Sequence, residues 1–261
     1  MPGRASPLSS VQKACRILSV LADTPRRRLT EIATHASLNK VTTLRILDVL
    51  VKESFVRRDE VTKTYSLGDQ ALVLAAAARD SDDVRARARP ALVRLARLSE
   101  DTVILSVRHA AESVCIDRET GSFPIRAAYI DVGARRPLGV GAGALALLAW
   151  LSDEEIDALL PQVAPRLAAY PRFSLASIRA SIERARAQGY TLVLDQIVDR
   201  MGAVGVPVLG LDGRPIAALS IAALSERISS RVPELVAALK EEAARIADPR
   251  LPVPRGEVMA A

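Results

Sequence analysis

The sequence has little of what several classes of protein require. Its two cysteines, Cys15 and Cys115, are too few for a disulfide scaffold and lack the spacing of a zinc site. Two histidines are too few for a histidine-rich metal site. The longest apolar run, residues 137–151, is shorter than the ~20 residues of a membrane-spanning helix. Residues 1–10 lack the apolar stretch of a signal peptide, so we expect a cytoplasmic protein without disulfide, metal or membrane contact.

Catalytic motifs are also missing from the sequence. It shows no Ser-His-Asp set, no Cys-His pair and no acid pair at useful spacing. The segment Gly141-Ala142-Gly143 lacks the Lys-Ser/Thr of a phosphate-binding loop. Asp195 and Asp199 fall in an expected loop and are interpreted as solvated turn charges. We therefore predict no catalytic residue and no cofactor, and an enzyme with an incidental basic head stays the less favoured alternative.

Charge, by contrast, is present and unevenly distributed. The formal net charge is +6. Residues 1–68 hold 12 Lys and Arg against 6 Asp and Glu, whereas residues 69–261 hold 24 of each kind. The chain is 49% hydrophobic and 25% charged, which is enough apolar material for a core. This division predicts a polyanion-binding head joined to a neutral body, and nucleic acid is the favoured polyanion.

The basic head has the pattern of a helix-turn-helix. Apolar residues recur at helical spacing over residues 11–21, which predicts an amphipathic helix with Cys15 on its apolar face, in the core. Two further short helices are predicted over residues 31–36 and 40–53, joined by a tight turn whose last residue, Asn39, caps the second. Two short helices joined in this way are typical of a DNA-binding helix-turn-helix.

The second of these helices divides into two faces. The residues expected to pack inward are Thr43, Ile46, Leu47 and Leu50. The residues expected on the outer face are Lys40, Val41, Leu44, Arg45 and Asp48. In a major groove, Val41 and Leu44 would suit thymine methyl groups, and Arg45 would read guanine or hold a phosphate.

A β-hairpin is predicted after this helix. Extended segments at residues 55–58 and 64–67 flank a polar turn, which after a helix-turn-helix forms the wing of a winged-helix domain. Basic residues on a hairpin fit a solvated surface as well as a phosphate contact, but their position around the helix-turn-helix favours DNA. The candidate DNA contacts are Arg26, Arg27, Arg28, Lys40, Thr42, Thr43, Arg45, Arg57, Arg58 and Lys63.

The neutral body begins with an Ala- and Leu-rich stretch that predicts a connecting helix over residues 69–80. Its apolar surface needs a partner. Further helices are predicted over residues 81–99, with Pro90 as a kink or restart, and over 141–151, 153–160, 175–188 and 232–247. Strands are predicted over residues 102–108, 113–117, 125–130, 190–194, 203–209 and 215–222. Strands and helices without regular alternation indicate an α+β domain with a mostly antiparallel sheet.

Several of these segments together resemble the IclR family of bacterial transcription regulators. Residues 11–18 are similar to the opening helix of that family, residues 38–47 to its recognition segment, where Thr42 and Arg45 match, and residues 65–68 to the end of its wing. In the body, residues 135–144 resemble the loop and helix start beside the effector pocket of the family, and residues 189–221 its C-terminal strands. The resemblance extends over residues 9–248.

The resemblance implies an α+β protein of two domains. Residues 1–68 would form a winged helix-turn-helix DNA-binding domain and residues 69–80 a linker helix. Residues 81–250 would form a GAF-like effector-binding and oligomerisation domain, and residues 251–261 a mobile tail. The implied partners are double-stranded operator DNA, a small-molecule effector and further copies of the chain, as a dimer or a tetramer. The sequence leaves open whether the protein represses or activates.

The effector site is predicted where a helix begins at the glycine-rich segment. Unpaired amides at a helix start favour an anion, so a ligand carboxylate would lie against Ala142 and Gly143. The resemblance assigns the remaining pocket positions to Val193, Met201, Ala203, Ser220 and Ala222. This lining is too apolar for a small, highly charged acid and favours a relatively apolar or aromatic carboxylate. A body without a ligand, serving only oligomerisation, stays the alternative.

Overall fold

The computed structural model describes residues 8–23, 26–77, 84–127 and 129–248. The last residues of the predicted linker helix, 78–80, and the predicted tail, 251–261, lie outside the described residues. The chain divides into two compact units, Met1–Ser81 and Asp82–Ala261, which are described separately below.

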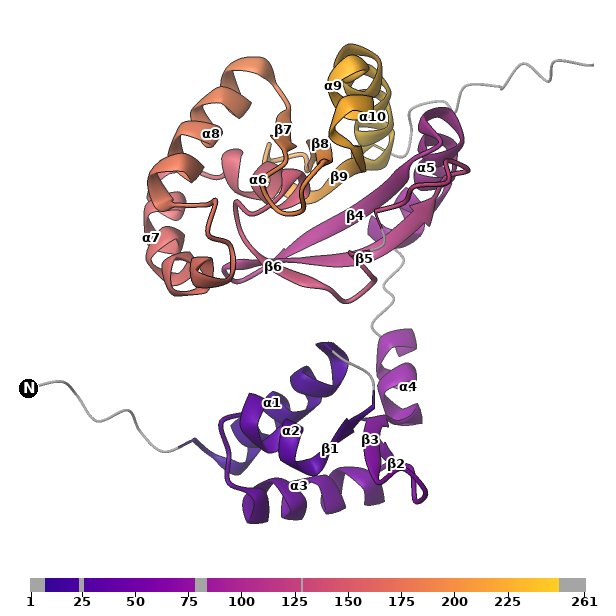
Figure 1. The fold of residues 1–261 in the computed structure, drawn as a ribbon, viewed down its shortest axis with the longest axis vertical. Helices are drawn as coiled ribbons and strands as arrows, with labels where there is room; N and C mark the ends of the chain where they lie inside the picture. The colour runs from indigo at the N-terminus through magenta and orange to yellow at the C-terminus, as the bar shows by residue number, and fades with distance from the viewer. Residues whose placement is uncertain (1–7, 24–25, 78–83, 128, 249–261) are drawn as a thin grey trace, which may run out of the picture. The chain divides into compact units, whose positions relative to one another are not determined.

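The N-terminal unit contains short helices around a small antiparallel sheet (Figure 1). Its elements are α1 (Ser10–Asp23), β1 (Arg27–Arg28), α2 (Leu29–His35), α3 (Lys40–Lys52), β2 (Val56–Arg58), β3 (Thr64–Leu67) and α4 (Asp69–Ala77). The three-stranded sheet has the order β1-β3-β2. The core between helices and sheet includes Ile17, Leu21, Ile32, Leu47 and Tyr65, all nearly or completely buried. This is the predicted winged helix-turn-helix, with β1 as a third strand that was not predicted.

One residue, Asn39, fixes the start of α3. The Asn39 side chain accepts a hydrogen bond from the Thr42 amide at 2.8 Å, as expected of an N-cap. The Thr43 hydroxyl donates to the Asn39 carbonyl at 2.9 Å and so secures the same turn. The predicted cap and helix are therefore confirmed.

The prediction for Cys15 is wrong, because Cys15 is exposed. The buried stripe of α1 is centred on Ile17 and Leu21, which are 0% and 2% exposed. Residues two apart on a helix point ~200° apart, so Cys15 lies on the far side of α1 from Ile17.

The C-terminal unit is built on a six-stranded sheet of order β6-β5-β4-β9-β8-β7, in which all neighbours are antiparallel (Figure 1). Its strands are β4 (Thr102–His109), β5 (Glu112–Thr120), β6 (Arg135–Pro137), β7 (Thr191–Leu194), β8 (Met201–Leu209) and β9 (Pro215–Leu224). Its helices are α5 (Val84–Ser99), α6 (Ala142–Ala149), α7 (Asp153–Val163), the 3₁₀ helix η1 (Ala164–Ala169), α8 (Leu175–Gln188), α9 (Ser225–Ser230) and α10 (Val232–Ala247). The predicted α+β domain with an antiparallel sheet is confirmed.

Alternation along the strands gives this sheet two different faces. Successive side chains of a strand point to opposite sides. On β4, Val103 and Leu105 enter the core formed with α5, α9 and α10. Ile104 and Ser106 instead point to a cavity on the other face, which is the face that α6 covers. The sheet therefore separates a closed apolar core from the candidate ligand site.

One local prediction in this unit is wrong. The described part of residues 125–130 forms no strand. The edge of β5 is already occupied by the following segment, since the Cys115 amide donates to the Ala134 carbonyl and β6 pairs with β5 beyond it. In addition, α5 runs through Pro90 as one helix, without a restart.

Candidate DNA-binding surface and effector cavity

The outer face of α3 is exposed as the sequence predicts. The exposed residues on this face are Lys40, Val41, Leu44, Arg45 and Asp48. Val41 is 69% exposed and Leu44 38% exposed, so neither side chain is needed for the core of the unit. Thr42, at the start of the helix, is half-buried. An exposed helix that carries cations and apolar side chains has the chemistry for a major groove.

Thr43 does not belong to this surface. It is completely buried, and its hydroxyl donates to the Asn39 carbonyl. Its inclusion among the candidate DNA contacts is therefore corrected, because a side chain inside the core cannot reach a base. Thr43 instead positions the start of α3.

The basic side chains of the wing form ion pairs that are largely exposed to solvent. Arg57 lies 3.7 Å from Asp69, and Lys63 lies 3.0 Å from Glu60, in pairs that are mostly exposed. Exposed ion pairs of this kind contribute little to stability, so a phosphate can take the place of the carboxylate. The Arg58 guanidinium stacks over the Tyr65 ring at 5.7 Å.

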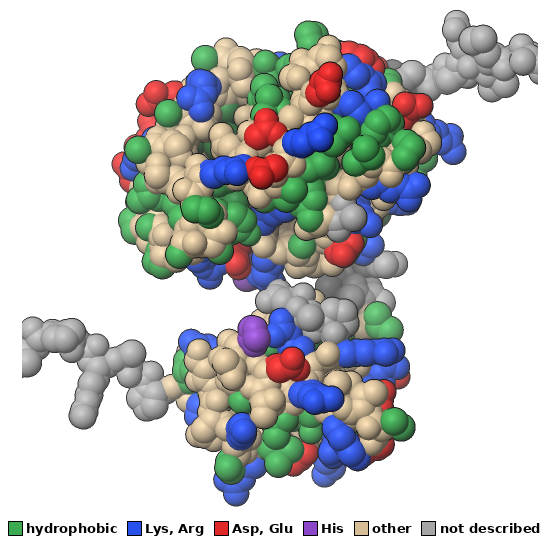
Figure 2. All heavy atoms as spheres, viewed as in Figure 1, with side chains coloured by type: hydrophobic (Ala, Val, Ile, Leu, Met, Phe, Trp, Pro, Cys, Tyr) green, Lys and Arg blue, Asp and Glu red, His purple; other side chains and the backbone are tan. Residues whose placement is uncertain are grey.

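The arginine run before α2 divides between strand and surface. Arg26 and Arg28 are exposed, whereas Arg27 is half-buried where β1 pairs with β3. On the face of the N-terminal unit seen in Figure 2, Lys and Arg side chains are more prominent than Asp and Glu side chains.

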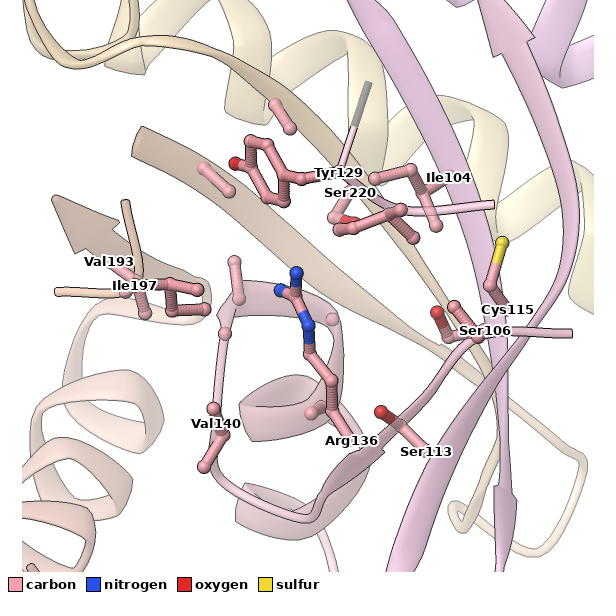
Figure 3. A pocket seen from close by; sticks show the side chains of 18 of the residues that line it. Ile104, Ser106, Ser113, Cys115, Tyr129, Arg136, Val140, Val193, Ile197 and Ser220 are labelled. Carbon is pink, nitrogen blue, oxygen red and sulfur yellow. The ribbon is translucent and has the colours of Figure 1, made fainter. Parts of the chain in front are cut away.

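The C-terminal unit contains a cavity between the sheet and the start of α6 (Figure 3). Its empty volume is about 610 Å³, a figure that includes open solvent at its mouth. All the residues predicted for the effector site line it, namely Ala142, Gly143, Val193, Met201, Ala203, Ser220 and Ala222. Residues far apart in the sequence therefore meet around one space.

The start of α6 is fixed against this cavity. Gly141, the residue before the helix, has φ +95°, a conformation that side-chain-bearing residues rarely adopt. The Thr191 hydroxyl donates to the carbonyl of Ala142, with the two oxygens 2.9 Å apart. A side chain on Gly205 would crowd the Ala142 backbone, because its Cβ would lie 3.1 Å from the carbonyl carbon. These contacts hold the first, unpaired amides of the helix at the cavity wall.

Several lining residues were not among those predicted, and Arg136 is the charged one. Arg136, on β6, extends into the cavity with its guanidinium 5.4 Å from the centre of the Tyr129 ring. Figure 3 shows it between Val193 and Ile197 on one side and Ser106 and Cys115 on the other. The available signal was the pair Arg135-Arg136, since neighbours on a strand point to opposite faces. Arg135 points outward and forms an ion pair with Glu112.

Burial changes the acid–base behaviour of the lining. Burial raises the pKa of the Cys115 thiol to about 11. Burial likewise raises the pKa of the Tyr129 phenol. Both groups are therefore uncharged near neutral pH.

Models of known protein families match both units. The IclR helix-turn-helix domain matches residues 10–60, and the bacterial transcriptional regulator IclR C-terminal domain matches residues 76–248. The chain belongs to the IclR family. It is thus a DNA-binding transcriptional regulator.

Individual IclR-family proteins are similar over nearly the whole chain. The HTH-type transcriptional regulator KipR of Bacillus subtilis is 28% identical over 243 residues, 91% of this chain and 95% of that protein. The crystal structure of an IclR transcriptional regulator from Alicyclobacillus acidocaldarius has a TM-score of 0.78 at 29% identity, covering 92% and 98% of the two chains. An IclR homologue from Microbacterium hydrocarbonoxydans, complexed with 4-hydroxybenzoate, has a TM-score of 0.76 at 23% identity, with the same coverage.

No helix among the described residues is long and apolar enough to cross a membrane. The same residues contain no group of three or more His, Cys, Asp or Glu side chains placed to hold a metal ion.

Proposed function

We propose that this IclR-family regulator binds operator DNA through the exposed face of α3 and the wing, and that a small molecule in the cavity changes this binding. The proposal rests above all on one observation. The unpaired amides at the start of α6 lie at the wall of a cavity that is otherwise mostly apolar. The exposed, partly apolar face of α3 supports the DNA contact.

Within the DNA-binding surface, we assign different tasks to two groups of residues. Arg45, with Thr42 beside it, reads base edges or holds the adjacent phosphate. Lys63 and the arginines of the wing contact phosphates, which carry no sequence information. The arginines before α2 add to the same electrostatic attraction.

Two matched variants test this division. Arg45→Ala should lower discrimination between operator and random DNA by about 1–3 kcal/mol. Lys63→Ala should weaken binding to both DNAs evenly and reduce the salt dependence of binding by about one phosphate contact. Fluorescence anisotropy at several salt concentrations measures both effects. Unchanged affinity and specificity of Arg45→Ala would contradict the assignment.

We also propose that the protein acts as a dimer or tetramer. One α3 offers a short reading element, so two copies on a palindromic operator are the expected unit. Exposed apolar side chains on α4 support a self-contact, since Leu72 is 70% exposed and Val73 56% exposed. Sedimentation of the free protein and of its operator complex measures the copy number, and a monomer in both would contradict the proposal.

The effector that fits the cavity best is a relatively apolar or aromatic carboxylate. Its carboxylate would lie against the first amides of α6, beside Ala142 and Gly143. Its body would contact the apolar residues Val193, Met201, Ala203 and Ala222, with Ser220 as a polar contact. The 4-hydroxybenzoate complex of an IclR homologue supports this chemistry.

Thermal shift and gel shift assays together test the effector proposal. Benzoate and 4-hydroxybenzoate should raise the melting temperature and change the shift of the DNA upstream of the protein's own gene. Small dicarboxylates should do neither. Stabilisation by dicarboxylates but not by aromatic acids would overturn the choice of effector. DNA binding that no metabolite changes would favour the alternative of a pure oligomerisation body.

We further infer that the protein performs no catalysis and acts in the cytoplasm. The names of its relatives describe transcriptional regulators, which supports a role in binding. Incubation with a bound effector, followed by chromatography, should return that effector unchanged. Turnover would favour the alternative of a small-molecule enzyme.

A further inference from the structure

We infer that Arg136 is the specificity-determining residue of the cavity and that its guanidinium selects an effector carrying a single negative charge. The inference rests on the proposed function, because it takes the cavity as the effector site. It goes further by naming the residue that supplies the counter-charge, and it predicts a property of the ligand-free protein.

Among the described residues, Arg136 has no acidic partner. The described residues that line the cavity include no Asp and no Glu. Among all the described residues, the contact that the structure gives the Arg136 side chain is the face of the Tyr129 ring. Arg136 is half-buried, and a cation withdrawn from water normally has an acid beside it. An anion that neutralises Arg136 therefore has to come from a ligand.

Two neutral groups near Arg136, Tyr129 and Cys115, do not become that anion. Burial raises the pKa of Tyr129, and it raises the pKa of Cys115 to about 11, so both stay protonated near neutral pH. Burial also lowers the pKa of Arg136, which is the direction expected of a cation without compensation. An arginine side chain nevertheless keeps its charge at neutral pH.

Further hydrogen-bonding groups converge on the same space. A methyl group on Gly141 would lie 3.2 Å from Arg136 Nη1, which places the guanidinium beside the start of α6. A methyl group on Gly143 would lie 3.2 Å from Ser220 Oγ and 3.6 Å from Ser106 Oγ. These serines are 4% and 7% exposed, and neither hydroxyl has a hydrogen-bond partner among the described residues.

The apolar walls of the cavity limit the number of charges that a ligand can carry. Away from the guanidinium and the serines, apolar side chains line the cavity, among them Ile104, Val140, Val193 and Ile197 (Figure 3). A second carboxylate placed against them would lose its water without gaining a partner. The arrangement therefore fits a monoanion with an apolar body.

A cation without an acidic partner also affects the stability of the ligand-free protein. It has lost part of its hydration without gaining an ion pair, so it lowers the stability of the ligand-free state. An unbranched apolar side chain of similar length removes this penalty. Arg136→Met should therefore raise the melting temperature of the ligand-free protein while it abolishes the response to carboxylates.

The test uses the full chain, with Arg136→Met, Arg136→Lys and the matched control Arg135→Met, which removes the same charge from the next residue. Calorimetric titration and thermal shift are measured with benzoate and 4-hydroxybenzoate, and with benzamide and 4-hydroxybenzamide as neutral counterparts. Wild type and Arg135→Met should bind the carboxylates about 10- to 100-fold more tightly than the amides. Arg136→Met should lose this preference, and Arg136→Lys should keep part of it.

The outcomes separate the two proposals. Equal preference for carboxylates in wild type and Arg136→Met overturns the role of Arg136 and leaves the effector site standing. If no probe stabilises wild type, the aromatic-carboxylate effector fails, and the ligand-free melting temperatures decide the inference. A higher value for Arg136→Met than for wild type then supports an uncompensated cation, and a lower value overturns it.

Discussion

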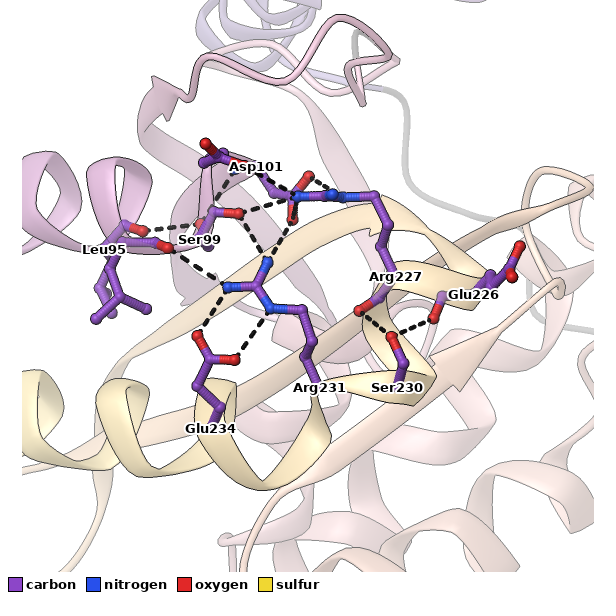
Figure 4. A network of polar contacts seen from close by, with 10 residues as sticks. Leu95, Ser99, Asp101, Glu226, Arg227, Ser230, Arg231 and Glu234 are labelled. Carbon is purple, nitrogen blue, oxygen red and sulfur yellow. Dashed lines mark hydrogen bonds and ion pairs between the residues drawn. The ribbon is translucent and has the colours of Figure 1, made fainter.

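Arginine side chains on the two faces of the six-stranded sheet differ in whether they have an acidic partner. Beside α5 and α9, Arg227 donates two hydrogen bonds to the buried carboxylate of Asp101, at 3.1 and 3.2 Å (Figure 4). Arg231 donates to the Ser99 carbonyl at 3.0 Å and to Glu234 at 2.8 Å. On the cavity face, Arg136 contacts an aromatic ring and has no acidic partner among the described residues.

A second network on the closed face repeats the pattern. Arg94 of α5 contacts both carboxylate oxygens of Glu242 on α10, at 2.7 and 2.6 Å. Arg245 adds a third contact to the same carboxylate at 3.0 Å. Such a two-point pair fixes the relative position of the helices as well as their charge.

The difference separates structural charge from functional charge. Where the protein supplies both the arginine and the acid, the ion pair holds helices together. Where the described residues supply the cation alone, as at Arg136, we propose that the partner is a ligand. Counting arginines in the sequence does not distinguish the two cases, because both faces draw on the same residue type.

Removing the acid from the closed face should have the largest effect. Asp101→Ala removes the carboxylate that Arg227 and Arg231 share, so Arg227 loses both hydrogen bonds to it and Arg231 keeps Glu234. Because the two arginine side chains are 23% and 24% exposed, we expect a loss of about 2–3 kcal/mol in unfolding free energy of the C-terminal unit. Urea unfolding followed by circular dichroism measures it.

The control for this experiment is Glu183→Ala, which removes an exposed acid from α8. It should change the unfolding free energy by less than about 0.5 kcal/mol. If Asp101→Ala costs no more than this control, the closed face does not depend on its ion pairs.

A pair of buried threonines offers the next test. The Thr191 hydroxyl holds the start of α6 through Ala142, whereas the buried Thr102 hydroxyl has no hydrogen-bond partner among the described residues. Thr191→Val should cost about 1–2 kcal/mol and weaken benzoate binding, since the helix start loses an anchor. Thr102→Val should be neutral or stabilising, because it removes a polar atom that gains nothing.

Unfolding in urea and calorimetric titration compare these two variants directly. Equal costs would show that the hydrogen bond to α6 does not stabilise the cavity wall. A loss of stability without a loss of benzoate affinity would separate the fold of the helix start from its role in binding.

The smallest effect on stability is expected inside the cavity. Gly143→Ala adds a methyl group 3.2 Å from Ser220 Oγ, a side-chain atom that can shift, and alanine favours a helix over glycine by ~1 kcal/mol. The two effects oppose each other, so the unfolding free energy should change by less than about 1 kcal/mol. Benzoate affinity should nevertheless fall at least tenfold. Unchanged affinity would place the carboxylate away from the start of α6.

Local chemistry made parts of this protein predictable. Asn39 is a strong cap, so the start of α3 was predicted to the residue. Gly189 adopts the left-handed conformation that ends α8 at Gln188, again as predicted. Both signals act within one helical turn and do not depend on what packs against the helix.

Predictions that depended on distant partners were less secure. Residues 125–130 have strand-like composition, but the neighbouring segment already occupies the edge of β5. Cys15 has apolar neighbours in sequence, but the packing of α1 is centred on the opposite side. Composition alone does not show which of two apolar surfaces the fold covers.

The sequence by itself determined the division into a basic head and a neutral body, the recognition helix with its cap, and the residue types around the effector site. The tertiary structure alone decided which arginine of the pair Arg135-Arg136 enters the cavity. In β6, Arg136 pairs with Ser113 of β5, and partners across a sheet share a face. A shift of one residue would have exchanged the two side chains, and that register depends on contacts between distant parts of the chain.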